Sequence, residues 1–273
     1  MNVQSIFDAI LLGIVEGVTE FIPVSSTAHL ILTARLLGLE GGGAQEFWNT
    51  FNVLIQLGAI VAVVVVYFAR LWKVVLGLPR DPDARRFALS ILTAFLPAAL
   101  VGVLAHDFIK DVLFNSLELI CIVLIVGGVA LALLDRYDVV PVHADAMRLP
   151  LGVALAIGLF QCLAIVPGVS RSGATIAGAL LMRCDKRAAA EFSFFLAIPT
   201  MLGAFVLDFY ENRGALSGDD IGIVAIGFVV SFLAALVVVR TLIGFVVRHG
   251  FMPFAWWRIA VGAAGLVAIW AYG

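Results

Sequence analysis

The chain has 273 residues, of which 63% are apolar and only 13% are charged. A water-soluble domain of this length would not tolerate such a composition, so the sequence predicts an integral membrane protein. The formal net charge is −2, and no basic stretch carries interleaved aromatic residues, which excludes nucleic acid as an expected partner. Apolar runs of about 20 residues without period-two alternation indicate spanning helices rather than a β-barrel.

A polar stretch, EGVTEFIPVSSTAH, interrupts the apolar sequence at residues 16–29. A carboxylate inside a bilayer costs roughly 2.5–3.5 kcal/mol on insertion scales, so two of them in one segment are expected to serve a function. Glu16 and Glu20 are four residues apart and therefore project from one face of a helix. Pro23 should end that helix because it lacks an N–H and clashes with the preceding turn.

Beyond the break, hydroxyl residues predict the start of a new helix. Ser25 is a candidate N-cap, and the new helix would begin with the free N–H groups of Ser26, Thr27 and Ala28, which form a ready anion site. His29 follows Ser26 by three residues and shares its helix face. The grouping is typical of a phosphate-binding tip.

The spans follow from hydropathy. Residues 6–22 and 26–38 are each too short and polar to cross alone, but joined at Pro23 they can form a re-entrant hairpin over 6–38. Six segments are long enough to cross the bilayer: 51–69, 87–105, 117–134, 192–210, 221–247 and 251–271. The connections expected between spans are a basic loop after Ala69, a polar turn at 106–111 and a polar loop over 135–148, and Pro97 should kink the second span.

The pattern restarts in the second half of the chain. Residues 151–166 form another short apolar segment, which ends in PGVSRSGAT at 167–175 and continues as a short helix to Met182, predicting a second hairpin over 151–182. A shift of 145 positions aligns Gly13 with Gly158, Glu16 with Gln161, Ser25 with Ser170, Thr27 with Ser172, Glu46-Phe47 with Glu191-Phe192, and Gly58 with Gly203. This ordered match indicates a duplication within one membrane domain covering 1–273, with repeats over about 1–134 and about 150–273.

Lysine and arginine placement predicts the orientation. If the chain starts outside and each hairpin returns to its own side, the outer side keeps only Arg35, Lys110 and Arg213. The inner side then holds Arg70, Lys73, Arg80, Arg85, Arg86, Arg136, Arg148, Arg183, Lys186, Arg187, Arg240 and Arg248. Both termini lie outside, and three spans between the hairpins make the second enter from the opposite face. The expected fold is an all-α polytopic membrane protein with an inverted-topology repeat, six transmembrane helices and two re-entrant hairpins whose tips meet near the midplane.

The two tips, EGVTEFIPVSSTAH and PGVSRSGAT, closely resemble those of the undecaprenyl-diphosphate phosphatase family of bacteria, also known as bacitracin-resistance proteins. The resemblance extends to the chain length, the EFSFFLAIP stretch at 191–199 and the final span. It implies hydrolysis of undecaprenyl diphosphate to undecaprenyl phosphate and inorganic phosphate, which recycles the lipid carrier for cell-wall synthesis. One departure is Ala28, where many members are expected to have Gly.

The resemblance also implies a multi-pass place in the bacterial cytoplasmic (inner) membrane, an active site open to the outer, periplasmic side, and contact with membrane lipids. A homodimer is compatible with it. Its motifs assign catalytic roles to Glu16, Glu20, Ser26, His29 and Arg171. Substrate binding is expected at Ser25, Thr27, Ser170, Ser172, Gly173 and Thr175.

The chemistry of these residues agrees with such a role. The hard oxygens of Glu16 and Glu20 suit Mg²⁺ or Ca²⁺ bridging to substrate phosphate, so both are also expected metal ligands. Arg171 supplies a forked, permanent charge, and no Asp or Glu within 151–182 occupies it.

Two alternatives stay open at this level. Either Ser26 attacks phosphorus with His29 as its base, or His29 activates water while Ser26 only binds phosphate. A transporter or flippase of polyprenyl phosphate would use the same inverted repeat. The other large class of lipid phosphatases is disfavoured, because its Lys-x6-Arg-Pro motif is missing and no His follows Ser170-Arg171 at the required short distance. Four polar residues near membrane depth receive no role: Asn52, Gln56, Glu191 and Asp208.

Overall fold

A computed structural model of the protein describes residues 3–39, 42–104, 116–137, 140–212 and 220–272. Within these ranges the chain is all-helical and contains no β-strand; a single isolated bridge pairs His143 with Cys184. The polar turn expected at 106–111 lies outside the described residues. The helices are α1 (Val3–Thr19), α2 (Ser26–Leu36), α3 (Gly42–Val66), α4 (Phe68–Gly77), α5 (Pro82–Leu104), α7 (Leu117–Arg136), α8 (Leu151–Gln161), α9 (Arg171–Leu181), α10 (Lys186–Asn212), α11 (Ile221–His249) and α12 (Met252–Tyr272), with short 3₁₀ turns η2 (Ala146–Arg148) and η3 (Cys162–Ile165).

Six of these helices are long and apolar enough to cross a membrane, and they match the six expected spans. The apolar stretches are Phe47–Val66 in α3, Pro82–Leu104 in α5, Leu117–Arg136 in α7, Lys186–Leu207 in α10, Ile221–His249 in α11 and Met252–Ala271 in α12. Pro97 lies inside α5, which continues on both sides of it. The chain is therefore a multi-pass membrane protein of the all-α class.

The basic loop expected after Ala69 is mostly helical, so that expectation was wrong. Helix α4 places Phe68, Trp72, Val75 and Leu76 at positions i, i+4, i+7 and i+8, and all four side chains are exposed. Apolar residues at this spacing form one face of an amphipathic helix, while the basic residues between them face elsewhere. Such a helix suits the interface between lipid and water.

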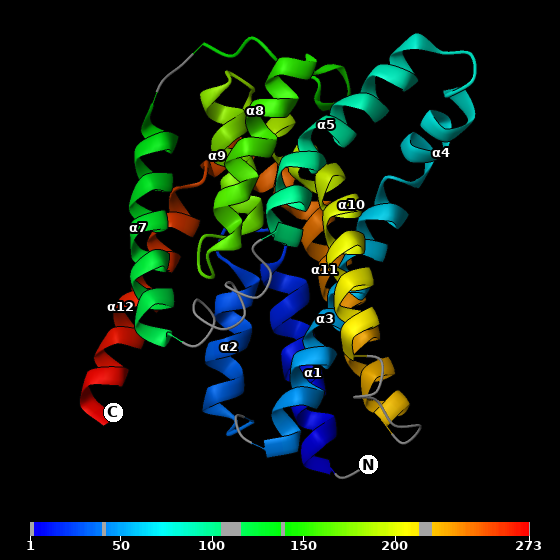
Figure 1. Ribbon diagram of the computed structural model, residues 1–273. Helices are drawn as coiled ribbons and strands as arrows, with labels where there is room; N and C mark the ends of the chain where they lie inside the picture. Colours follow the sequence, from blue (N-terminus) through cyan, green and yellow to red (C-terminus); the bar gives the residue numbers. More distant parts are fainter. Residues whose placement is uncertain (1–2, 40–41, 105–115, 138–139, 213–219, 273) are drawn as a thin grey trace.

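Two pairs of short helices, α1–α2 and α8–α9, are each interrupted by non-helical backbone. Helix α1 ends at Thr19, four residues before Pro23, and residues 20–25 form the first break before α2 begins. Residues 162–170, between α8 and α9, form the second break. Figure 1 shows α1 and α2 in the lower half of the view and α8 and α9 in the upper half, with the two breaks facing each other at mid-height. Polar residues of both breaks are thereby brought to the centre of the bundle.

Gly13 in α1 and Gly158 in α8, which align when the sequence is shifted by 145 positions, let these two helices pack closely on their neighbours. A Cβ on Gly13 would lie 2.7 Å from the carbonyl oxygen of Gly227 in α11. A Cβ on Gly158 would overlap the carbonyl oxygen of Ala94 in α5. Small residues allow such close backbone approach between apolar helices, so α1 docks on α11 in the same way as α8 docks on α5.

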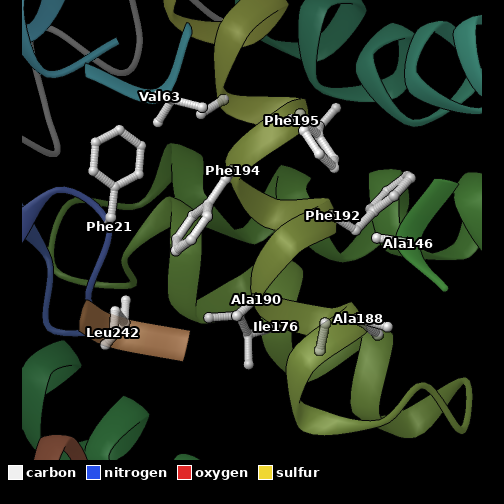
Figure 2. Close-up of a cluster of buried hydrophobic side chains, with 14 of the residues drawn as sticks. Phe21, Val63, Ala146, Ile176, Ala188, Ala190, Phe192, Phe194, Phe195 and Leu242 are labelled. Carbon is white, nitrogen blue, oxygen red and sulfur yellow. The ribbon is translucent and has the colours of Figure 1, made fainter. Parts of the chain in front are cut away.

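The first break is anchored in the main apolar core. Phe21 is fully buried, and its ring meets that of Phe194 edge to face, with centroids 5.4 Å apart. Figure 2 shows Phe21 beside Phe194 of α10, with Phe192 and Phe195 farther along the same helix. Because aromatic rings bury a large apolar area, this contact holds the break against α10, which also carries polar partners of the site.

Candidate functional site

Glu20 lies where the two breaks meet. Nη2 of Arg171 donates to Oε1 of Glu20 at 2.8 Å, and the Ser26 hydroxyl donates to Oε2. The side chains of Arg171 and Glu20 are only 12% and 7% exposed, so the ion pair is largely shielded from water. Residues 151 positions apart in sequence therefore form one polar centre.

Arg171 is held by further contacts. Its Nη1 donates to the backbone carbonyl of Ser193 at 2.7 Å, and its guanidinium carbon lies 5.9 Å from the ring centroid of Phe21. Nη2 also lies 3.7 Å from the sulfur of Met201. Its buried Nε has no hydrogen-bond partner among the described residues. The guanidinium is thus oriented at the breaks while one of its donors stays unused.

Glu16 lies one turn before Glu20 and is fully buried. The helical bond from the Glu20 N–H to the Glu16 carbonyl, 3.0 Å long, preserves the predicted four-residue spacing although α1 ends at Thr19. Neither carboxylate oxygen of Glu16 has a hydrogen-bond partner in the described part of the chain. Since a buried carboxyl without a partner is costly, this position calls for a proton or a cation.

The donor set also fits a divalent ion. The described residues contain no group of three or more His, Cys, Asp or Glu that could hold a metal. Two carboxylates are nevertheless enough for Mg²⁺, which usually takes one or two from the protein and completes its shell with water and substrate phosphate.

His29 faces a residue that the sequence did not suggest. The indole N–H of Trp257 donates to Nε2 of His29 at 2.8 Å, and the two rings are nearly parallel. Because Nε2 accepts, the ring proton lies on Nδ1, which is 2.8 Å from the carbonyl oxygen of Ser25. The Ser26 hydroxyl bonds to Glu20, so the described residues do not show the Ser26–His29 contact that the first of the two alternatives would use.

Two aligned serines cap the helices that follow the breaks. The Ser25 hydroxyl accepts from the N–H of Ala28 at 3.4 Å, and the Ser170 hydroxyl accepts from the N–H of Gly173 at 3.0 Å. The expectation that the Ala28 N–H is free was therefore wrong, because the cap occupies it. The φ angles of Ser25 and Ser170 are 74° and 75°, values that non-glycine residues rarely adopt and that tend to mark functional sites.

The other expected substrate-binding residues make internal contacts. The Ser172 hydroxyl donates to the carbonyl of Ile22 at 2.9 Å and so links the second break to the first. The Thr175 hydroxyl is fully buried and donates to the Ser193 hydroxyl at 2.7 Å. Thr27 is half-buried at the start of α2. These contacts support a role in shaping the site, and direct binding of substrate by these residues stays a prediction.

Arg258 of α12 was missed by sequence reasoning. Its side chain is 1% exposed and donates to backbone carbonyls of both breaks: Pro23 at 3.1 Å, Val169 at 2.9 Å and Gly168 at 2.8 Å. A signal was available, because Arg258 is the only charged residue within 251–271 and charges inside a span usually serve a function. Arg258 therefore ties the two breaks together.

We expect Arg258→Met to lower the free energy of unfolding by about 3 kcal/mol, because the carbonyls of Pro23, Gly168 and Val169 lose a charged, buried donor. Thermal unfolding of the purified protein in detergent measures this effect. Arg136→Met, at the exposed last turn of α7, is the control and should change little. Equal melting temperatures for wild type and Arg258→Met would contradict the tying role.

Comparison with known proteins gives consistent matches over nearly the whole chain. The family model described as bacitracin resistance protein BacA matches residues 9–264. An undecaprenyl-diphosphatase of Sinorhizobium fredii is 61% identical over 270 residues, covering 99% of each chain. Undecaprenyl-diphosphatase 1 of Agrobacterium fabrum is 60% identical over 273 residues, covering 100% of each chain, and an undecaprenyl-diphosphatase of Caulobacter vibrioides is 57% identical over 262 residues, covering 96% of this chain and 97% of its own.

Proposed function

The chain belongs to the bacitracin resistance protein BacA family, and from this we propose that it hydrolyses undecaprenyl diphosphate to undecaprenyl phosphate and inorganic phosphate. The observation that carries the proposal is the contact of Glu20 with both Ser26 and Arg171 at the meeting point of the two breaks. A base, a hydroxyl and a phosphate-binding guanidinium at one buried centre suit phosphoryl transfer.

The reaction breaks the P–O–P bond and releases the lipid monophosphate as leaving group. The Ser26 hydroxyl donates to Glu20, which supports Ser26 as the nucleophile that attacks the terminal phosphorus and Glu20 as the acceptor of its proton. Water then hydrolyses the phosphoserine and releases inorganic phosphate. His29 has both ring nitrogens engaged, which favours a positioning role near Ser25 over that of base for Ser26.

Arg171 links substrate binding to this proton transfer. Its Nη2 pairs with Glu20 and stabilises the carboxylate by a charge-assisted hydrogen bond. Phosphate oxygens attract a guanidinium through paired, charge-assisted hydrogen bonds, so the substrate competes with Glu20 for Arg171. Such competition would leave the Glu20 carboxylate free of Arg171 and available to the Ser26 hydroxyl when the diphosphate is in place.

Glu16 and Glu20 are the residues that would hold Mg²⁺ or Ca²⁺. The unpartnered, buried oxygens of Glu16 support this assignment. A divalent ion held there would supply positive charge that neutralises the diphosphate and the lipid monophosphate that leaves.

Phosphate release from undecaprenyl diphosphate by the purified protein in detergent tests the proposed activity. Detergent micelles have no two sides, so a transporter or flippase would show no reaction. Release with Mg²⁺ or Ca²⁺ and its loss with EDTA is the expected result. The absence of release under both conditions would refute the activity.

For the architecture, we propose an inverted-topology repeat with re-entrant hairpins α1–α2 and α8–α9. Two observations support this architecture. Ser25 and Ser170 have matching φ angles and each caps an 11-residue helix, 145 positions apart. Three spans, α3, α5 and α7, separate the two hairpins, so the second enters from the opposite side of the membrane. Outer termini follow from the lysine and arginine asymmetry, and a site open to the periplasmic side is what the family resemblance implies.

Single cysteines introduced at Asp81 and Asp219 should report this orientation in intact cells. We expect a membrane-impermeant thiol reagent to label the cysteine at 219 and not the one at 81, because Asp81 follows the basic helix α4. Labelling of both after permeabilisation is the control. Labelling of position 81 alone in intact cells would reverse the assigned topology.

A further inference from the structure

A polar pocket is separated from the first break by Phe194, whose ring centroid lies 6.4 Å from that of Tyr67 in the pocket wall and 5.4 Å from that of Phe21. It has a volume of about 560 Å³ and is formed by the end of α3, the start of α10 and the last turns of α11. In Figure 1 this is the end of the bundle near α4, away from the N-terminus. Four arginines line it: Arg70, Arg187, Arg240 and Arg248.

The positive charge of this pocket is not balanced. Among the described residues that line it, Glu191 is the only acidic one, and it pairs with Arg70 at 3.2 Å and with Arg187 at 3.5 Å. Arg240 and Arg248 have no hydrogen-bond or ion-pair partner among the described residues. Since one carboxylate faces four guanidinium groups, the pocket attracts anions.

Tyr67 adds a neutral donor to the same wall. Burial, with a further contribution from Glu191, raises the pKa of Tyr67, so its phenol keeps its proton. The guanidinium carbon of Arg70 lies 5.8 Å from the centroid of the Tyr67 ring and is thereby steered toward the pocket. Guanidinium and phenol donors together match the oxygens of a phosphate.

The rest of the lining is apolar, consisting of Val66, Val239, Ile243, Gly244 and Val247. Helix α4, which begins beside Tyr67, exposes the apolar face described above and suits the lipid interface. A pocket with basic donors, an apolar wall and a place at interface level matches a charged headgroup joined to hydrocarbon chains better than a soluble ion.

We propose that this pocket is a binding site for the phosphate-bearing headgroup of an anionic lipid, separate from the site at the two breaks. Free phosphate shares the anionic oxygens but not the chains, so the two sources can be told apart. The proposal does not depend on the proposed hydrolysis.

The test is native mass spectrometry of the full-length protein in detergent, titrated with dioleoyl phosphatidylglycerol. Dioleoyl phosphatidylcholine, with the same chains, and inorganic phosphate are titrated separately. The variant is Arg240→Gln with Arg248→Gln, and its matched control is Arg85→Gln with Arg86→Gln, two exposed arginines of α5 that do not line the pocket. Gly244→Leu adds bulk to the pocket without changing its charge. A Cβ at this position meets no atom within 4 Å, so the substitution should not clash with the backbone around it.

We expect wild type to retain phosphatidylglycerol in preference to phosphatidylcholine, and Arg240→Gln/Arg248→Gln and Gly244→Leu each to weaken this retention about tenfold. The Arg85→Gln/Arg86→Gln control should bind as wild type, and all variants should release phosphate from undecaprenyl diphosphate within twofold of wild type.

Equal loss in the control pair would show only a diffuse basic surface and overturn the proposal. Unchanged retention in both pocket variants would also overturn it, and pocket-dependent binding of inorganic phosphate alone would refute the lipid as ligand.

Discussion

Arg171→Lys is expected to lower kcat for phosphate release by about 100-fold, and Arg171→Ala by about 1,000-fold, as for other guanidinium groups that act on transferring phosphoryl groups. A lysine keeps the charge but cannot bond to Ser193 and Glu20 together, because its ammonium is one point on a flexible stem. Turnover at saturating undecaprenyl diphosphate measures the effect.

The matched control is Arg183→Lys, just beyond the end of α9, where the arginine also donates to a backbone carbonyl, that of Val140. It should keep wild-type turnover. Turnover of the Arg171→Lys variant within a few-fold of wild type would refute paired recognition of phosphate, and equal activity of the alanine variant would remove the second break from the active site.

Glu16→Gln is expected to lower turnover by about 100-fold or more without lowering thermal stability. The carboxyl is fully buried and unpartnered in the described part of the chain, so its replacement by a neutral amide removes a desolvation cost. Turnover falls because a neutral amide is a much weaker ligand for Mg²⁺ or Ca²⁺ than a carboxylate. The measurements are a Mg²⁺ titration of phosphate release and a melting curve in EDTA.

Asp8→Asn is the control for Glu16→Gln, since Asp8 is a second buried carboxylate of α1 but accepts from Gln4 at 2.9 Å. It should keep the Mg²⁺ dependence of wild type. If Glu16→Gln showed normal turnover and an unchanged Mg²⁺ titration, Glu16 could not be a metal ligand. A melting temperature well below that of wild type would mean that the carboxylate is structural.

The sequence by itself determined the helices and the residues of the polar centre. Hydropathy sets the six spans because the length of an apolar run must match the bilayer, and the structure has helices at all six. Polar side chains are rare in membrane-spanning sequence, which is why the sequence pointed to Glu16, Ser25, Arg171 and the polar residues near them. The prediction of a loop was wrong at α4, because the apolar residues of this basic segment have helical spacing.

Only the tertiary structure decided which of these residues meet. The bond from Arg171 to Glu20 joins positions 151 apart, and no local pattern specifies such a partner. The same holds for Arg258, which reaches both breaks from α12, and for Trp257, whose indole N–H donates to Nε2 of His29. Local propensity and hydropathy act over a few turns of helix, whereas these contacts depend on how α12 and the two broken pairs pack. Glu20, Ser26 and Arg171 were therefore readable from sequence, whereas their pairing and the contributions of Trp257 and Arg258 were set by packing.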